Sequence, residues 1–256
     1  MPYLSHAELW RKYGARKMGN GFFVALDWAK AFDSIFPEAL TRALRRFGCP
    51  LKLVSVIGAI YENRTFVVQD NGICSNPKTQ HYGICQGCPL SPFLFIIVMT
   101  VLLHDAKEDF ENMYGISNEA FVVQDLVYAD DTILIGADGD RVEGYMESVV
   151  HIGKEYGLQL NWNKVEALPC RMTVRMTSPF DENIQSRSSI ICLGSLLSAD
   201  GQIMSEINRR LGMAAKDFKI LQSVWSHTNL TQAWKIYIFD SCIVQIIVWF
   251  SDCEFE

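Results

Sequence analysis

The feature that most constrains this chain is a pair of adjacent aspartates, Asp130 and Asp131, between two short apolar runs. Both runs are rich in Val, Ile, Leu, Tyr and Thr, which predicts two strands joined by a tight turn with the carboxylates at its tip. Neighbouring carboxylates repel each other unless cations neutralise them, and hard oxygen ligands suit Mg²⁺ or Mn²⁺. The stretch therefore predicts a metal site, with a pair of surface acids in a solvated turn as the alternative.

A third aspartate follows a second apolar run. Residues 21–26 are almost continuously apolar and end at Asp27, which is typical of a buried central strand that delivers one carboxylate to a sheet edge. Asp27 can meet the aspartate pair only if this strand and the hairpin are neighbours in one sheet. In that case the three carboxylates can bind two divalent ions about 3.5–4 Å apart, as in two-metal phosphoryl-transfer sites.

Helical periodicity surrounds these strands. Ser91 followed by Pro92 predicts a helix start, with Ser91 as the N-cap. The helices expected from apolar spacing cover residues 37–47, 51–61, 91–110, 142–156, 203–225 and 230–249. Further strands are expected at 65–68, leading into a hairpin at Asp70–Asn71–Gly72, and at 158–161 and 164–168. This order of elements predicts an α+β core followed by a small helical module.

Composition adds limits rather than a function. The net charge of −6 does not indicate a nucleic-acid binder, although residues 1–60 carry nine basic and four acidic side chains whereas residues 61–170 carry six and sixteen. The eight cysteines are scattered and no leader peptide is recognisable, which indicates reduced thiols and an intracellular protein. The longest apolar run, residues 93–103, is too short to cross a bilayer, so no membrane partner is expected.

Five segments, taken in order, resemble the palm motifs of reverse transcriptases. They are Asp27–Asp33 (DWAKAFD), Gln86–Pro92 (QGCPLSP), Tyr128–Asp131 (YADD), Gly157–Lys164 (GLQLNWNK) and Leu193–Gly194. The motifs resemble those of the non-LTR (LINE-like) retrotransposon enzymes, to which the group II intron enzymes are related. This resemblance implies a polymerase palm, an antiparallel sheet packed on helices, over residues 21–200. A partial helical thumb would follow over 201–256, and residues 1–20 would be residual fingers or a connector.

The resemblance also implies an RNA-directed DNA polymerase. Asp27, Asp130 and Asp131 would bind two Mg²⁺ (or Mn²⁺) ions, and Lys164 would protonate the departing pyrophosphate; an exposed lysine at a strand end is the alternative for Lys164. The primer 3′-hydroxyl would attack the α-phosphate of a deoxynucleoside triphosphate, directed by an RNA template. The expected partners are therefore an RNA template, a DNA primer and dNTPs.

Four residues match positions beside the incoming nucleotide. The resemblance assigns nucleotide binding to Trp28, to Phe32 as the aromatic gate against a 2′-hydroxyl, and to Gln86 and Gly87, where a missing side chain lets backbone approach the substrate. A core phenylalanine and a plain loop are the alternatives for Phe32 and for the Gln86–Gly87 pair. The residues that support the motifs without a direct role are Tyr128, Ala129, Pro89 and Ser91.

Departures from the family pattern keep other readings open. Cys85 stands where the family usually has Arg or Lys, and only 26 residues precede Asp27, where the family has basic finger strands. The chain therefore looks like a fragment of a longer polyprotein with fingers and an endonuclease, and a catalytically inactive remnant that keeps the palm fold is one alternative.

Two more alternatives come from other classes. Cys85 and Cys88, with Cys74 and His81 nearby, have one pair at the spacing of a structural zinc site or a redox pair. An RNA-templated RNA polymerase shares the palm logic but usually has Gly before the paired aspartates.

Overall fold

The computed structural model describes residues 21–115, 123–171, 176–179, 183–192, 194–227 and 229–248. The chain divides into two compact units. The sheet unit comprises Phe22–Ala167 and Thr173–Ser186, and the helical unit comprises Met1–Gly21, Leu168–Met172 and Arg187–Glu256. The predicted bounds of the palm, 21–200, and of the thumb, 201–256, stay predictions. The expected fingers segment, 1–20, and Leu193 lie outside the described residues.

A five-stranded sheet forms the centre of the sheet unit. Its order is β6(Gln124–Tyr128), β7(Asp131–Gly136), β1(Gly21–Leu26), β8(Glu166–Cys170) and β9(Gln185–Ser186). The central strand β1 pairs antiparallel with β7, and β7 pairs antiparallel with β6 as a hairpin, whereas β8 and β9 are parallel. The strand before Asp27 and the aspartate hairpin are therefore neighbours in one sheet, as the sequence predicts.

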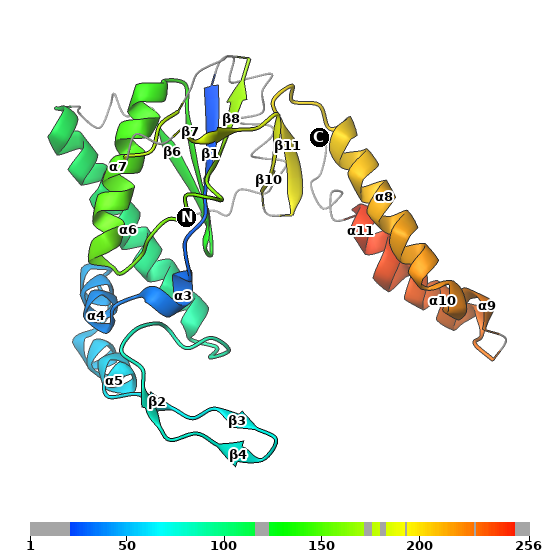
Figure 1. Ribbon diagram of the computed structural model, residues 1–256, viewed down its shortest axis with the longest axis horizontal. Coiled ribbons are helices and arrows are strands. Elements are labelled where there is room, and N and C mark those ends of the chain that lie inside the picture. The colour runs from blue at the N-terminus through cyan, green and yellow to red at the C-terminus, as the bar shows by residue number, and fades with distance from the viewer. Residues whose placement is uncertain are drawn as a thin grey trace. The chain divides into compact units, whose positions relative to one another are not determined.

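One face of this sheet is buried under two helices, α6(Ser91–Tyr114) and α7(Gly139–Glu155), which lie against each other (Figure 1). Because side chains alternate along a strand, every second residue of β1 and β7 lies on this face. These residues are all at most 5% exposed: Phe22, Val24, Leu26, Trp28, Thr132 and Leu134. Two glycines let α7 lie close to the sheet. A Cβ on Gly136 would lie 2.5 Å from Val142, and a Cβ on Gly153 would lie 3.2 Å from the ring of Trp28.

Within residues 21–90, three helices precede α6. They are α3(Ala31–Ser34), α4(Pro37–Arg46) and α5(Leu51–Tyr61), and the last two confirm the predicted helices to within one residue. The arginines of α4 fix it to its neighbours, because Arg42 pairs with Glu155 over 3.4 Å and Arg46 pairs with Asp105.

The helix start predicted at Ser91 is displaced by one residue. Leu90 is the N-cap and Ser91 is the first helical residue, followed by Pro92. The buried Ser91 hydroxyl donates to the carbonyl of Cys85 in the preceding loop instead of capping the helix. The sequence pattern identified the helix correctly but not the tertiary partner that takes the serine hydroxyl.

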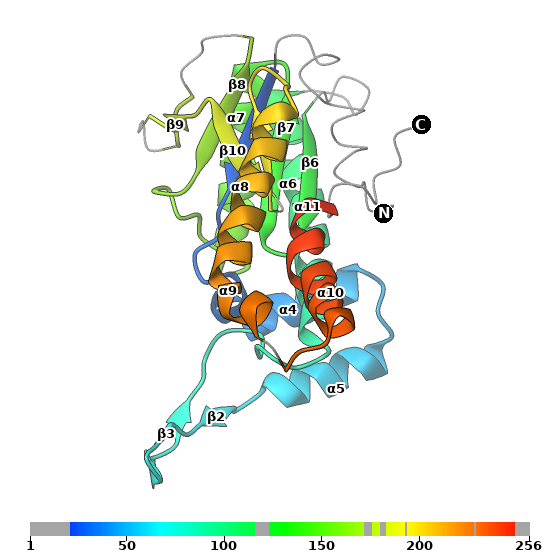
Figure 2. The ribbon, with the colours of Figure 1, turned by 90° about the vertical axis from the view of Figure 1, so that its right-hand side faces the viewer.

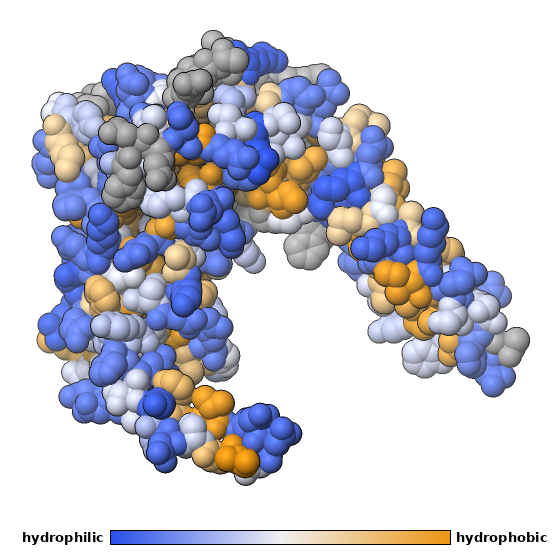
Figure 3. All heavy atoms as spheres, viewed as in Figure 1, coloured by the Kyte–Doolittle hydropathy of each residue, from blue (hydrophilic) through white to orange (hydrophobic). Residues whose placement is uncertain are grey.

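A hairpin extends from the sheet unit beyond α5 (Figure 2). Strands β2(Thr65–Phe66) and β5(Lys78–Thr79) form its base, and β3(Gln69–Asp70) and β4(Ile73–Cys74) form its tip. Asn71 and Gly72 at the tip both have positive φ, 48° and 81°, as the predicted Asn-Gly turn requires. The hairpin leaves apolar side chains exposed, which Figure 3 shows as a patch at this end of the unit; they include Phe66, Val67, Val68 and Ile73.

The C-terminal part of the helical unit contains another antiparallel strand pair, β10(Ser189–Cys192) and β11(Ser195–Ser198). Its described helices are α8(Met204–Ile220), α9(Gln222–Ser226), α10(Gln232–Phe239), a π-helical segment over Asp240–Val244, and α11(Gln245–Val248). Both predicted helical stretches of the tail are therefore present, but each is interrupted. No described helix of either unit reaches the length and apolarity that a bilayer crossing requires.

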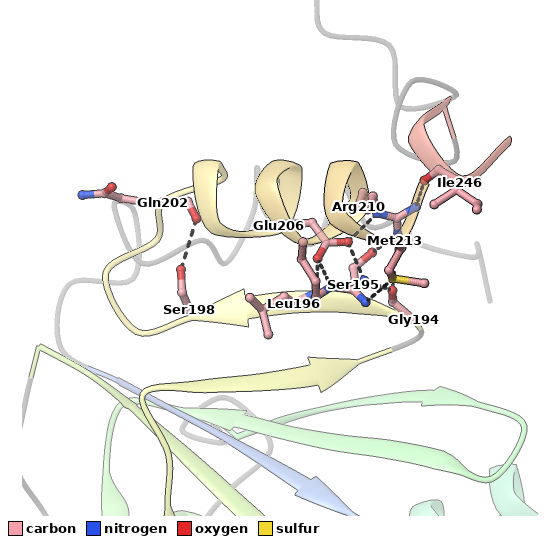
Figure 4. Close-up of polar contacts among 10 residues, drawn as sticks. Gly194, Ser195, Leu196, Ser198, Gln202, Glu206, Arg210, Met213 and Ile246 are labelled. Atoms are coloured by element: carbon pink, nitrogen blue, oxygen red, sulfur yellow. Dashed lines mark hydrogen bonds and ion pairs between the residues drawn. The ribbon is translucent and has the colours of Figure 1, made fainter. Parts of the chain in front are cut away.

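A buried ion network joins α8 to β11 and α11 (Figure 4). The Glu206 carboxylate accepts hydrogen bonds from Arg209, Arg210 and the Leu196 amide, and Arg210 also donates to the carbonyl of Ile246. Burial on its own would raise the pKa of Glu206, but these hydrogen bonds outweigh burial and lower it. The buried charge is thus compensated on every side, as a stable buried ion pair requires.

Gly157 closes the end of α7 against the segment that follows β1. It has φ +86°, and a Cβ built there would lie 2.3 Å from the Ser34 carbonyl oxygen. The adjacent Tyr156 carbonyl accepts a hydrogen bond from the Phe36 amide over 3.1 Å. Glycine is therefore required for two separate reasons, its backbone conformation and the close approach of another chain segment.

We expect Gly157→Ala to destabilise the chain much more than Gly48→Ala, and urea denaturation of both variants measures the difference. Gly48 has φ +92° but nothing within 4 Å of a built Cβ, so its substitution carries only the backbone strain. The steric overlap at Gly157 should lower the free energy of unfolding by about 1–3 kcal/mol more. Equal losses in the two variants would contradict the close approach.

Candidate functional site

Two of the predicted carboxylates lie opposite each other at the end of the central strand pair. Leu26 pairs with Thr132 across β1 and β7, so the next residues outward are Asp27 on one strand and Asp131 on the other. Both lie on the sheet face opposite to Trp28 and Thr132 because side chains alternate. The pairing therefore brings together residues that are about a hundred positions apart in the sequence.

The third carboxylate sits in the turn that joins β6 to β7. Tyr128 pairs with Asp131, which leaves Ala129 and Asp130 as the two turn residues. Ala129 has φ 53°, a left-handed conformation that is strained for a residue with a Cβ. Tyr128 is 56% exposed beside this turn. Strain at such a turn is typical of a functional position, where the surrounding structure holds the backbone in place.

The three carboxylates influence one another electrostatically. Partial burial raises the pKa of Asp131, and the negative charges of Asp130 and Asp27 raise it further. The site thus concentrates negative charge at one sheet edge, and hard oxygen donors in this arrangement suit a divalent cation such as Mg²⁺. Asp27, Asp130 and Asp131 are the residues that would hold it.

A lysine lies beside these carboxylates. The Asn161 amide donates to the Asp27 carbonyl over 2.8 Å, and Trp28 bridges to Leu160, so residues 159–161 run next to the end of β1. The chain then turns and carries the Lys164 ammonium to within 3.5 Å of the Asp27 carboxylate. Lys164 is exposed, so a ligand can reach its ammonium; its role as a proton donor stays a prediction.

Trp28 lies behind the carboxylates rather than beside them. Its ring is 5% exposed, and its Nε1 donates to the Thr132 hydroxyl over 3.1 Å. The indole is a core group, so the predicted contact with a nucleotide stays a prediction that only the Trp28 backbone could meet.

Phe32 and the glycine-rich loop lie next to each other. The ring of Phe32 stacks on buried Phe95, with centroids 4.4 Å apart, and is partly exposed. The Phe32 carbonyl accepts from the Ile84 amide over 2.6 Å, and a Cβ on Gly83 would lie 2.8 Å from the Asp33 backbone. Tertiary contacts therefore seat the loop directly against the helix that carries Phe32.

Gln86 and Gly87 lie at the exposed part of this loop. Nε2 of Gln86 donates to the Asp33 carboxylate over 3.1 Å, which orients the amide. Gly87 has φ +84° and nothing within 4 Å of a built Cβ, so its backbone faces open space where a ligand can approach. Pro89 is exposed in the same loop. The predicted nucleotide contacts of Gln86 and Gly87 stay predictions.

The cysteine alternative finds no support in the geometry. Cys85 and Cys88 are free thiols, and the Cys85 thiol donates only to the neighbouring Gln86 carbonyl. Among the described residues, the one group of three potential metal ligands whose atoms lie within 4.8 Å of one another is His104, Asp105 and Glu108.

That cluster on α6 is already occupied by protein cations and donors. Arg46 pairs with both Asp105 and Glu108, and the Tyr156 hydroxyl donates to Asp105 over 2.9 Å. A metal ion there would compete with an arginine, so we assign it no site. The ligand atoms of Asp27, Asp130 and Asp131 spread more widely than 4.8 Å. A site for two ions would tolerate that spread, because no single ion would have to contact every carboxylate.

Sequence reasoning missed the residues that orient the predicted ones. Thr132 is 1% exposed and accepts the Trp28 hydrogen bond, and Asp33 accepts the Gln86 amide. A threonine among buried aliphatic residues is the one signal that could have pointed to Thr132, because a buried hydroxyl needs a partner. Nothing in the sequence indicates the partner of Asp33.

Solved structures of low sequence identity share this fold. Apo telomerase from Candida tropicalis, truncated from its C-terminal domain, matches with a TM-score of 0.54 and 15% identity over 75% of this chain and 36% of that chain. Telomerase from Candida albicans in complex with a TWJ fragment of telomeric RNA gives 0.52 and 12% over 96% and 41%. The fold is that of a polymerase palm, and the predicted α+β class is confirmed.

Residues 4–194 match the family described as Reverse transcriptase (RNA-dependent DNA polymerase). The chain belongs to the reverse transcriptase family.

Two curated relatives agree with the predicted non-LTR type. The Retrovirus-related Pol polyprotein from type-1 retrotransposable element R2 of Nasonia vitripennis is 32% identical over 158 residues, which is 60% of this chain and 15% of the relative. The Transposon TX1 uncharacterized 149 kDa protein of Xenopus laevis is 27% identical over 195 residues, 75% and 15% respectively. The resemblance to non-LTR retrotransposon reverse transcriptases is thus confirmed. The chain spans only about 15% of the length of these relatives.

We expect Asp131→Asn to melt at a higher temperature than the unchanged chain at pH 7 in EDTA. A carboxyl whose pKa is raised on folding favours the folded state at low pH, and this contribution is lost as the pH rises through the folded-state pKa. The advantage of the variant should therefore shrink as the pH falls toward 4. Since exposed charges contribute less than ~1 kcal/mol, the difference should be at most about 4 °C.

Magnesium should reverse the order, because an ion that binds only the folded chain stabilises it. Adding Mg²⁺ should raise the melting temperature of the unchanged chain and leave Asp131→Asn nearly unaffected. Asp70→Asn, at the end of β3 in the exposed hairpin, serves as the control and should differ little from the unchanged chain under either condition. A variant that melts below the unchanged chain at pH 7 in EDTA would contradict the mutual repulsion.

Proposed function

We propose that this chain is the polymerase palm of an RNA-directed DNA polymerase, which transfers a nucleotide from a dNTP to a primer 3′-hydroxyl along an RNA template. The observation that carries the proposal is the convergence of Asp27 with Asp130 and Asp131 at one sheet edge, in a chain of the reverse transcriptase family. With Lys164 as the cation beside Asp27, the three carboxylates keep an excess of negative charge that favours a divalent ion, and two-metal phosphoryl transfer uses such a site.

The proposed cofactor is a pair of Mg²⁺ ions, or Mn²⁺. Bound at the carboxylates, they would favour deprotonation of the primer hydroxyl and neutralise the triphosphate. Asp27 and Asp131 would hold them from the two paired strands, and Asp130 from the turn. Lys164, 3.5 Å from Asp27, would lie along the triphosphate and give a proton to the departing pyrophosphate.

The nucleotide would lie between the carboxylates and the Gly83–Cys88 loop. Phe32, held by its stack on Phe95, would exclude a 2′-hydroxyl because a ring fixed by a buried partner cannot move aside. Gln86 would present its amide oxygen, since its nitrogen is engaged with Asp33. The exposed backbone at Gly87 would approach the base or the template.

An intracellular location is proposed because the cysteines are scattered through the sequence, a pattern typical of reduced thiols.

A palm that has lost its activity is the second candidate. Cys85, exposed at the position where the family usually has a basic residue, is the observation in its favour, because a phosphate contact is missing there. The unchanged carboxylates, and the lysine beside Asp27, favour the active reading.

The deciding experiment is primer extension by the purified chain on an RNA template with dNTPs and Mg²⁺ or Mn²⁺. Replacing both adjacent aspartates, Asp130→Asn with Asp131→Asn, should reduce extension by about 100-fold or more, because most of the charge that would hold the metal is gone. The substitution relieves repulsion, so the variant should remain folded, which a thermal melt verifies.

If the chain does not extend the primer, a second experiment uses a fusion in which the finger strands of a related reverse transcriptase are joined upstream of this chain. Extension that appears in this fusion and disappears with the two Asn substitutions supports the active palm. A fusion that stays silent, although folded and able to bind Mg²⁺, favours the inactive remnant and rejects the proposal.

We expect Phe32→Ala to raise the incorporation of ribonucleotides relative to deoxynucleotides by about tenfold or more, since one clash of this size is worth about 1–3 kcal/mol. Steady-state extension with each nucleotide gives the ratio. The control is Phe93→Ala, whose ring is 66% exposed on the same helix as Phe95. An RNA-templated RNA polymerase would instead accept ribonucleotides already and barely change.

A further inference from the structure

A buried hydrogen bond lies directly behind the carboxylates. Nε1 of Trp28 donates to Oγ1 of Thr132 over 3.1 Å. The two side chains are 5% and 1% exposed. Trp28 is the sequence neighbour of Asp27, and Thr132 is the neighbour of Asp131. The bond therefore joins the two strand ends at the point where the carboxylates leave the sheet.

Further contacts hold the indole ring and its backbone. A Cβ on Gly153 would lie 3.2 Å from the ring, so α7 packs closely against it. The backbone of Trp28 bridges to Leu160, and the Ala29 amide donates to the Gln159 carbonyl over 2.8 Å. With the ring seated in this way, its N–H has one orientation, and the Thr132 hydroxyl lies where that N–H points.

The buried N–H of Trp28 and the buried hydroxyl of Thr132 each need a hydrogen-bond partner, and each is the partner of the other. An indole N–H that is removed from water needs an acceptor, and a buried hydroxyl in a strand is costly unless it is hydrogen-bonded. The residues that follow Thr132 in β7, Ile133 to Ile135, are aliphatic and at most 5% exposed, so a valine would suit the packing at this position equally well.

We propose that Trp28 and Thr132 are positioning residues that set the separation of the Asp27 and Asp131 carboxylates and thereby make the site selective for Mg²⁺ over larger divalent ions. Magnesium requires near-ideal octahedral geometry with ligands at about 2.0–2.1 Å, whereas Ca²⁺ accepts flexible geometry at about 2.3–2.6 Å. A loosened strand pair therefore weakens Mg²⁺ binding more than Ca²⁺ binding. The inference rests on the proposed function, since it assumes that these carboxylates hold a divalent ion.

The test is titration of the full chain with Mg²⁺ alone and with Ca²⁺ alone in a calorimeter, for the unchanged chain and for Thr132→Val and Thr132→Ser. Thr132→Val keeps the shape but removes the hydroxyl, and it should weaken Mg²⁺ binding about tenfold while changing Ca²⁺ binding less. Thr132→Ser restores the hydroxyl and should keep the ratio of the two affinities. Thr100→Val is the matched control, because the Thr100 hydroxyl bonds only to the Ile96 carbonyl within α6.

Trp28→Phe approaches the same bond from its other side and keeps the test valid if Thr132→Val does not fold. It removes the N–H and leaves an aromatic ring in the core. The double variant, Trp28→Phe with Thr132→Val, should lower the Mg²⁺ to Ca²⁺ ratio no further than either single change, because the hydrogen bond is already absent in each.

Folded variants that lose stability but keep the Mg²⁺ to Ca²⁺ ratio would overturn the proposal and leave the bond a packing feature. An unchanged chain whose metal binding does not depend on Asp131 would overturn it as well. Primer extension is measured separately on the same preparations. A shifted ratio in a chain that does not extend primers would support the positioning role and reject the proposed activity.

Discussion

The site depends on the pairing of β1 with β7, in which Leu26 lies opposite Thr132 and the next residue on each strand is an aspartate. Because side chains alternate, a slip of one residue would turn Asp27 toward the helices and bring an aliphatic side chain to the site face. Phe22 and Val24 are fully enclosed on the helix-covered face and Ile135 is 2% exposed on the other, so a slip would have to repack both faces. The apolar pattern of two strands therefore determines where the charges lie.

Repulsion among the three carboxylates destabilises this arrangement. The fold tolerates the repulsion because its free energy is small. Exposed charges contribute less than ~1 kcal/mol each, whereas burying one large apolar side chain is worth about 1.5–3 kcal/mol. The face behind the carboxylates buries several such side chains, among them Phe22, Leu26 and Leu134. The free energy gained by burying the apolar face is therefore larger than the free energy lost through repulsion among the carboxylates. The site can keep its excess negative charge, which favours a cation, while the chain stays folded.

Local patterns predicted much of this from the sequence. Periodicity predicted helices in both units, and Asn71–Gly72 predicted a turn. The sequence also predicted that the strand before Asp27 and the aspartate hairpin are neighbours in one sheet. What escaped prediction is tertiary in origin. The hydroxyl of Ser91 bonds a loop carbonyl instead of capping its helix, and the indole of Trp28 is buried and bonds the hydroxyl of Thr132. Each outcome depends on a partner far away in the sequence, and local spacing carries no information about such partners.

The short helix α3 explains how the loop and the carboxylates come to share one site. Gly83 packs against the Asp33 backbone from one side, and Gly157 packs against the Ser34 carbonyl from another. The amide of Gly83 also donates to the Ile35 carbonyl over 2.8 Å. In both places a side chain would push the segments apart, so glycine is what allows the loop and the end of α7 to approach α3. Since α3 follows Asp27 after only three residues, a displacement of either glycine would move Phe32 relative to the carboxylates.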